Sequence, residues 1–298
     1  MTAKTAHGGL RIKWHSIIIY SIMIIFLIYL LFPFIWSLGA SFKGFVETYR
    51  GARRLVPKEP TLANYEWLFF KLPQFPRQLL NSIIVTGGSV GLTALLATAM
   101  GYGFARIDFR GRDLIFYSVI ISMFIPRSGG LMAQYELMSF LRLRNSLFGL
   151  ILAFSAGLPV SMFIMRQTFL YVPKEMEEAA AIDGASLWQT FWKVAMPMCT
   201  SGLVVVCILK FVQVWGDYLF TLTMIDDAQK MTAGIGVAIV KSFVRPDVTS
   251  TGSGQTVPIA TDGVLAAANI VVMAPVVILY VVLQKWFVRG LTEGILKF

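Results

Sequence analysis

The sequence predicts an all-α integral membrane protein with six transmembrane helices and one polar loop between two of them. Hydrophobic residues make up 56% of the 298-residue chain. Charged residues make up only 14%, well below the roughly one quarter that is usual in soluble domains. The apolar residues also form runs of about 20, the length that a helix needs to cross a bilayer core. We therefore expect residues 1–298 to form a single transmembrane domain.

Six apolar runs mark the expected helices. Their ranges are about 17–38, 80–105, 114–132, 145–166, 197–225 and 263–285. The first run has 22 residues, too many for the core of a cleaved signal peptide, so we expect it to remain as a membrane anchor. Pro126 and Arg127 cut the third run short and Lys210 interrupts the fifth, so these two spans are the least regular.

The second run is unusually rich in small residues. Its glycines are Gly87, Gly88, Gly91, Gly101 and Gly103. Small residues let helix backbones approach each other closely in a membrane, where packing drives helix association. We therefore expect this span to pack tightly against its neighbours.

Two long segments, about 41–77 and 226–262, are expected to form the main outer loops. The first carries seven Lys and Arg against three Glu, a net charge of 7 − 3 = +4. Such a field can attract an anionic solute or an acidic binding protein, or it can meet lipid headgroups. With the N-terminus inside, the cytoplasmic segments carry 12 Lys and Arg and the outer loops 13, so counting positive charges does not decide the orientation.

The polar loop, about 172–194, is predicted to form two short helices joined by a turn. Pro173 suits a first helical turn, and Glu175, Glu177 and Glu178 favour the positive end of a helix. Gly184 then allows a sharp break. The segment from Ala185 to Val194 has the apolar pattern of a second amphipathic helix.

The spacing within this loop resembles the signature loop of the membrane subunits of ABC importers. That pattern is Glu-Ala-Ala, three residues, Gly, nine residues, Ile, any residue and Leu-Pro; here Val194 and Met196 stand in place of Ile and Leu. The resemblance implies that the loop docks on an ATPase, which requires it to face the cytoplasm. The residues implied in this coupling are Glu178, Ala179, Ala180, Asp183, Gly184, Ala185 and Pro197.

Over nearly its whole length the chain is similar to the second permease of maltose-type and related oligosaccharide importers. Short segments in family order carry this resemblance: Ser41-Phe42-Lys43, Pro60 to Tyr65, Gly101 to Arg106, Asn145 to Leu152 and Phe287 to Gly294. The resemblance implies the ABC type I importer fold. It also implies a bacterial inner (cytoplasmic) membrane location with both termini in the cytoplasm.

The same resemblance implies the partners. They are a second homologous permease, two ATPase subunits that bind ATP and Mg²⁺, a binding protein outside the membrane, membrane lipid and a sugar substrate. The chain itself is expected to bind no cofactor and to catalyse no reaction. The tail resembles the family segment that reaches the ATPases, which implies contacts by Leu291, Thr292, Glu293 and Gly294.

A candidate substrate path lies in the fifth span, where Lys210 and Asp217 are charges flanked by apolar sequence. Seven residues of helix would place both on one face, with Gln213 between them and Trp215 and Tyr218 offering rings for sugar stacking. The alternative is that Lys210 reaches a membrane surface or a neighbouring subunit and that the rings are interfacial anchors. The family pattern Trp-Asn-Glu-Phe is Trp-Gly-Asp-Tyr here, which leaves the polar contacts at this point open.

Several classes are excluded or less favoured. The chain has no P-loop motif, and its two histidines, His7 and His15, lie near the N-terminus, so we expect neither ATP binding nor a metal site. Cys199 and Cys207 are eight residues apart on one predicted helix, too far for a disulfide. The basic charge does not predict nucleic-acid binding.

The alternatives that stay open are an ABC permease for another solute, such as a peptide or phosphate, and a secondary transporter. Basic outer loops and Lys210 together favour an acidic oligosaccharide, such as a uronate fragment of the alginate type.

Overall fold

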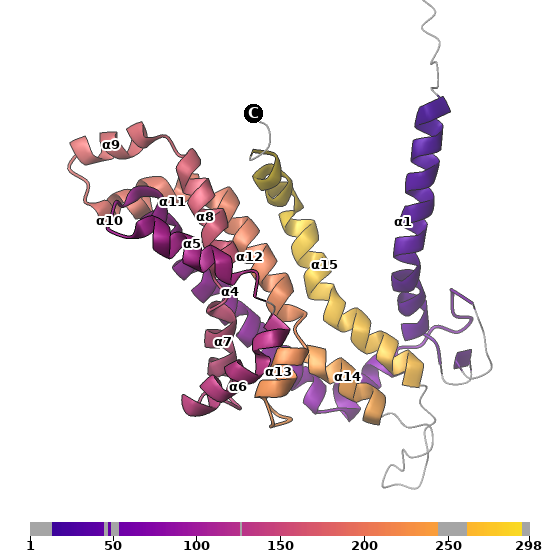
Figure 1. Cartoon of the computed structure of the whole chain (residues 1–298). Helices are drawn as coiled ribbons and strands as arrows, with labels where there is room; N and C mark the ends of the chain where they lie inside the picture. The colour runs from indigo at the N-terminus through magenta and orange to yellow at the C-terminus, as the bar shows by residue number, and fades with distance from the viewer. Residues whose placement is uncertain (1–13, 45–46, 49–53, 126, 244–260, 294–298) are drawn as a thin grey trace, which may run out of the picture. The chain divides into compact units, whose positions relative to one another are not determined.

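The computed structural model describes residues 14–44, 47–48, 54–125, 127–243 and 261–293, and these residues form helices, turns and bends without a strand (Figure 1). The elements are α1 (Trp14–Ser41), α3 (Ala63–Glu66), the π-helix η1 (Trp67–Lys71), α4 (Gln74–Arg106), α5 (Arg112–Ser122), the 3₁₀-helix η2 (Arg127–Gly130), α6 (Leu131–Phe140), α7 (Leu147–Ser155), α8 (Pro159–Tyr171), α9 (Lys174–Ile182), α10 (Leu187–Thr190), the π-helix η3 (Phe191–Ala195), α11 (Met196–Met198), α12 (Thr200–Trp215), α13 (Leu219–Met224), α14 (Ala233–Phe243) and α15 (Thr261–Glu293).

The chain divides into two units, the first formed by Met1–Glu66 and Val244–Ile270. In this unit, hydrogen bonds tie the end of α1 to α3. The side-chain amide of Asn64 donates to the carbonyl oxygens of Ser41 (2.8 Å) and Lys43 (2.9 Å), and the Tyr65 hydroxyl donates to Ser41 Oγ (2.8 Å). None of the residues from Ile17 to Leu38 in α1 is buried. Its exposed side chains are therefore suited to contact lipid or another membrane subunit.

The second unit, Trp67–Phe243 and Val271–Phe298, is organised around α4. This helix packs against α7, α8, α12 and α14 (Figure 1). A Cβ atom added at Gly101 would lie 2.6 Å from Cβ of Met165, and one added at Gly88 would lie 2.7 Å from Cδ1 of Ile151. Two of the five glycines thus permit the close packing expected of this span, because a larger residue would collide with α8 or α7.

Three of the described helices are long and apolar enough to cross a membrane, at Ser16–Ser41, Gln74–Arg106 and Asp262–Lys285. Two bent pairs raise this number to five: α7 with α8, bent by 50°, and Leu187–Met198 with α12, bent by 76°. The third expected span, about 114–132, contains most of α5, the 3₁₀-helix η2 and the first two residues of α6. The longest of these, α5, has 11 residues and rises about 16 Å, less than the bilayer core of about 30 Å. The count of six spans therefore stays a prediction.

The fifth expected span is not one continuous helix. The helix α12 ends at Trp215, Gly216 follows as its C-cap, and α13 begins at Leu219. The expectation that Lys210 and Asp217 lie on a single helix face is therefore wrong, because Asp217 lies beyond the helix end.

Candidate functional site

The first helix of the predicted polar loop is α9, and a turn at Gly184 ends this helix. Pro173 precedes the helix, and Glu175 and Glu177 lie in its first turn. At the other end, the amide of Gly184 donates to Ala181 O (3.0 Å) and that of Ala185 to Ala180 O (2.9 Å). This is the Schellman pattern of a helix C-terminus. Gly184 has φ = +81°, so the break expected at this residue is present and requires a left-handed backbone.

The second arm of the loop starts with a capping box. The Ser186 hydroxyl accepts from the backbone amide of Gln189 (3.3 Å), and the backbone amide of Ser186 donates to Gln189 Oε1 (2.8 Å). These reciprocal bonds fix the start of α10 at Leu187. The Ser-x-x-Gln pattern in the sequence is the signal for this cap, and the helix starts two residues after the expected Ala185.

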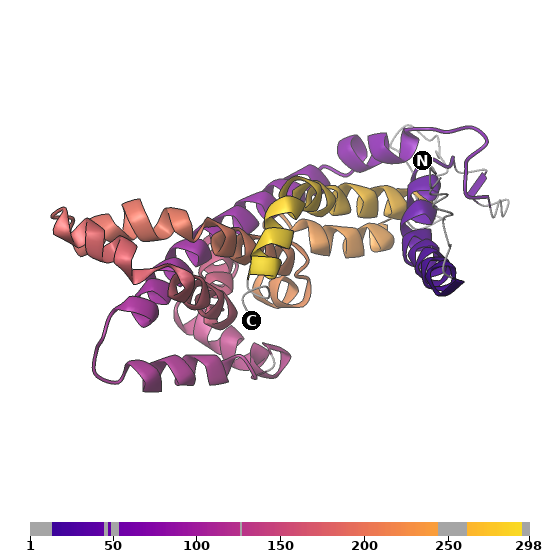
Figure 2. The same cartoon turned by 90° about the horizontal axis from the view of Figure 1, so that it is seen from above.

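The loop presents an exposed apolar surface, which we call the docking face and define as Met176, Ile182, Leu187 and Trp188. The exposed fractions of Ile182, Leu187 and Trp188 are 87%, 74% and 68%. In Figures 1 and 2, α9 and α10 form one end of the second unit. Large apolar side chains gathered on an exposed loop are typical of surfaces that contact another protein or a membrane.

Six of the seven predicted coupling residues lie beside the docking face, in α9 and the turn that follows it. Glu178, Ala179, Asp183 and Gly184 are exposed, and Ala180 and Ala185 are half-buried. Pro197 lies apart from them in α11, at the 76° bend between the second arm and α12. Their roles in coupling stay a prediction.

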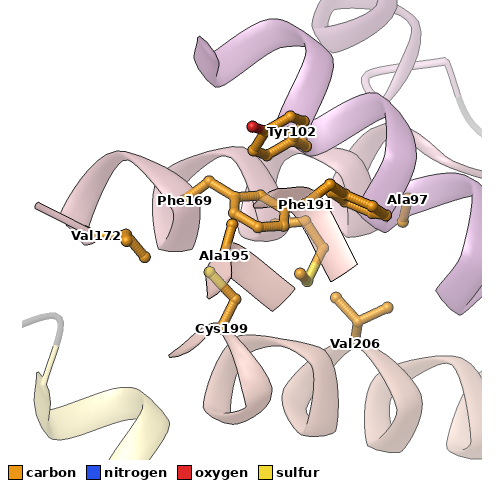
Figure 3. Close-up of a cluster of buried hydrophobic side chains, with 9 residues drawn as sticks. Ala97, Tyr102, Phe169, Val172, Phe191, Ala195, Cys199 and Val206 are labelled. Carbon is orange, nitrogen blue, oxygen red and sulfur yellow. The ribbon is translucent and has the colours of Figure 1, made fainter. Parts of the chain in front are cut away.

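Beneath the loop, a buried cluster joins it to the membrane helices (Figure 3). The ring of Tyr102 on α4 lies 5.3 Å from that of Phe169 on α8 and 5.0 Å from that of Phe191 on η3. Phe169 precedes the loop in sequence, and Phe191 lies near the end of the loop. One α4 side chain therefore contacts both ends of the loop, and α9 adds a polar contact of its own through Glu177.

A cavity of about 890 Å³ lies deeper in the second unit. Residues of α5, α6, α7, α8, α12 and α13 line it, and its polar side chains include Gln134, Ser161, Lys210, Gln213 and Asp217. Its size is within the range of about 300–1,000 Å³ typical of small-molecule sites. Three of the five residues predicted for a substrate path, Lys210, Gln213 and Asp217, thus surround one cavity.

Lys210 is held at the break between α7 and α8. Its ammonium donates to the carbonyl oxygens of Phe154 (2.9 Å) and Gly157 (3.1 Å), and the residue is only 2% exposed. Carbonyl oxygens at a helix C-terminus carry partial negative charge and favour a cation. Asp217 Oδ1 accepts from both the amide and the hydroxyl of Thr221 (2.9 Å each), so it caps the start of α13.

Trp215 and Tyr218 are not among the residues that line the cavity. The Trp215 indole donates to the carbonyl oxygen of Val272 on α15 (2.8 Å), and its ring stacks on Phe211 at 5.5 Å. Trp215 therefore ties α12 to α15. Tyr218 is 43% exposed. Neither ring offers a stacking surface inside this cavity.

The predicted tail contact falls at the edge of the described residues. Leu291, Thr292 and Glu293 belong to the last turn of α15, and Gly294 lies outside the part of the chain that the structure describes. Their contact with an ATPase stays a prediction.

The structure combines three features: apolar helices that can cross a membrane, a cavity with polar side chains, and an exposed docking face. Together they define a transport subunit of a membrane complex. The chain belongs to the family of binding-protein-dependent transport system inner membrane components, which matches residues 89–293. Members of this family are transporters rather than catalysts, and this membership does not support the alternative of a secondary transporter.

Individual relatives agree with this family. The chain is 32% identical to the sulfoquinovosyl glycerol transport system permease SmoH of Agrobacterium fabrum, over 90% of this chain and 89% of the relative. It is 29% identical to the arabinooligosaccharides transport system permease AraQ of Halalkalibacterium halodurans, over 89% and 91%. A bacterial ABC transporter that imports the acidic polysaccharide alginate has the same fold, with a TM-score of 0.84 over 96% of this chain and 100% of that chain at 21% identity.

Proposed function

We propose that this chain is a permease subunit of an ABC importer for oligosaccharides. The observation that carries the proposal is the docking face, whose large apolar side chains are exposed on a loop with the spacing of the ABC signature. The partners are the second permease, the two ATPase subunits and the external binding protein. ATP and Mg²⁺ bind in the ATPases and not in this chain, whose sequence has no P-loop.

The mechanism is alternating access driven from the docking face. Closure of the ATPases displaces α9 and α10, which pivot about Gly184, and the attached membrane helices follow. ATP can shift this equilibrium only because the ATPases bind the two states with different affinities. The loop must therefore lie in the cytoplasm, and both chain termini lie on the same side.

The cavity supports a polar substrate of sugar size. Its side chains combine donors and acceptors of hydrogen bonds with apolar walls, the composition typical of small-molecule sites. Relatives named for arabinooligosaccharide and sulfoquinovosyl glycerol transport support sugars over peptides or phosphate.

Among sugars, acidic oligosaccharides are supported by two observations. The outer loops carry 13 Lys and Arg, which favour the approach of an anion. Lys210 contributes a cation to the cavity, although Asp217 contributes an anion, so the cavity by itself is electrically balanced. The basic outer loops therefore carry most of the argument for an acidic substrate.

The test uses the assembled transporter in proteoliposomes with its binding protein. Uronate oligomers and neutral glucose oligomers of equal length are compared as stimulators of ATP hydrolysis and as transported solutes. We expect uptake of an oligosaccharide, preference for the uronate, and weaker uptake as salt screens the outer loops. Equal stimulation by the neutral oligomer would remove the acidic substrate and leave the oligosaccharide. Uptake of peptide or phosphate without any sugar uptake would overturn the sugar importer.

A further inference from the structure

An ion pair beneath the docking face joins three helices at one residue. Arg106, the last residue of α4, donates from Nε to Glu177 Oε1 of α9 (2.7 Å). A second guanidinium nitrogen donates to the carbonyl oxygen of Val172 (2.5 Å), the C-cap of α8. The side chains of Arg106 and Glu177 are only 8% and 14% exposed. Short hydrogen bonds between ionised groups shielded from water are among the stronger polar contacts in proteins.

Tyr102 completes the contact from one turn earlier on α4. Residues four apart lie on the same helix face, and the Tyr102 hydroxyl donates to Glu177 Oε2 (3.0 Å). Each carboxylate oxygen of Glu177 thus accepts from a different α4 side chain. The Tyr102 ring is itself fixed against Phe169 and Phe191 (Figure 3). We call Tyr102, Arg106 and Glu177 the α4–α9 latch.

Glu177 differs from its acidic neighbours on α9. Glu175 and Glu178 are exposed, whereas Glu177 is turned toward α4. The helix therefore has one side available for a partner and one carboxylate bound to the membrane helix. The helix at the other end of this connection, α4, packs against α7, α8 and α12, which line the cavity.

We propose that the α4–α9 latch transmits displacement of the docking face to α4 and thereby to the walls of the cavity. Arg106 and Tyr102 are positioning residues in this role, because they act through Glu177 and contact neither substrate nor nucleotide. Separating an ion pair that is largely shielded from water leaves two charges without compensation. An external force on α9 consequently moves α4 with it instead of pulling the two helices apart. This inference rests on the proposed ABC importer function.

The experiment measures substrate transported per ATP hydrolysed in the reconstituted transporter. Arg106→Gln and Glu177→Gln should each lower this ratio by about fivefold or more, the lower end of the range for coupled sites. The double variant should be no worse than the more impaired single variant, because both changes remove the same ion pair. Only assembled complexes are compared, so a loss of folding reduces transport and hydrolysis together and leaves the ratio unchanged.

Glu175→Gln is the matched control, since it removes the same charge from the exposed side of α9. It should retain the ratio of the unmodified transporter. Tyr102→Phe keeps the packed ring and loses only the hydroxyl, so it decides the matter if the Arg106 and Glu177 variants do not assemble. We expect a lower ratio in Tyr102→Phe as well.

Unchanged transport per ATP in the assembled Arg106 and Glu177 variants would overturn the latch. So would a double variant whose loss equals the product of the two single losses, or an equal loss in Glu175→Gln. If those two variants do not assemble, an unchanged ratio in Tyr102→Phe overturns it. Failure of the proposed function is separate, because the unmodified complex would then transport no sugar at all.

Discussion

Gly184 is the residue at which the proposed pivot can be tested most cleanly. Its φ of +81° is a left-handed conformation, and a Cβ atom placed there would meet no atom within 4 Å. A substitution is therefore disfavoured by backbone strain and not by collision. For an ordinary L-residue this strain is about 1–2 kcal/mol, equivalent to about a 5–30-fold change in an equilibrium.

Three substitutions at this exposed position should raise the backbone strain in steps. Asn adopts the left-handed conformation more readily than other residues, Ala less so, and a β-branched residue such as Val least. We expect substrate transported per ATP to be near normal in Gly184→Asn, reduced in Gly184→Ala by a factor within that 5–30-fold range, and lowest in Gly184→Val. The assay is uptake and hydrolysis in proteoliposomes, with copurification of the ATPases as the measure of assembly.

The order of the three variants is what the reasoning requires. Gly184→Val with the ratio of the unmodified transporter would refute the need for a left-handed turn. If Gly184→Asn were as impaired as Gly184→Val, the position would require the absence of a side chain and not a particular backbone angle.

The remaining predictions concern the cavity, the tail and helix packing. Lys210→Met should lower uptake of a uronate oligomer more than uptake of a neutral one. The change removes a cation together with the hydrogen bonds to two carbonyl groups. Equal losses for the two oligomers would leave Lys210 a purely structural role. Deleting residues 291–298 should lower substrate-stimulated ATP hydrolysis without preventing membrane insertion, and unchanged hydrolysis would make the tail dispensable for coupling. Gly101→Leu should destabilise the protein by about 1–3 kcal/mol or more through overpacking against Met165, whereas Gly87→Ala, with open space around it, should change the thermal transition in detergent little.

The class of protein and its docking loop could be predicted from the sequence because both depend on local features. Apolar runs of sufficient length require helices, since a bilayer offers no water to satisfy backbone polar groups. The break in the loop follows from Gly184 itself, because glycine takes a positive φ at little steric cost. Spacing along one chain was enough in each case.

Contacts between distant residues could not be derived in this way. Seven-residue spacing predicted a shared helix face for Lys210 and Asp217, but Gly216 ends the helix, so Asp217 lines the same cavity from beyond the helix end. The rings expected to hold sugar do not line the described cavity, and Trp215 donates to Val272, 57 residues further along the chain. Their place in a substrate path stays a prediction.

The α4–α9 latch shows the same limit most clearly. Arg106 and Glu177 are 71 residues apart, and nothing in the sequence around either residue indicates the other. The sequence by itself determined a membrane transport subunit with a glycine-hinged loop, because helix length and turn geometry are local properties. Which glutamate of α9 faces α4, and which arginine it meets, depends on the packing of α4 against α8, because the close approach at Gly101 brings the ends of these helices together.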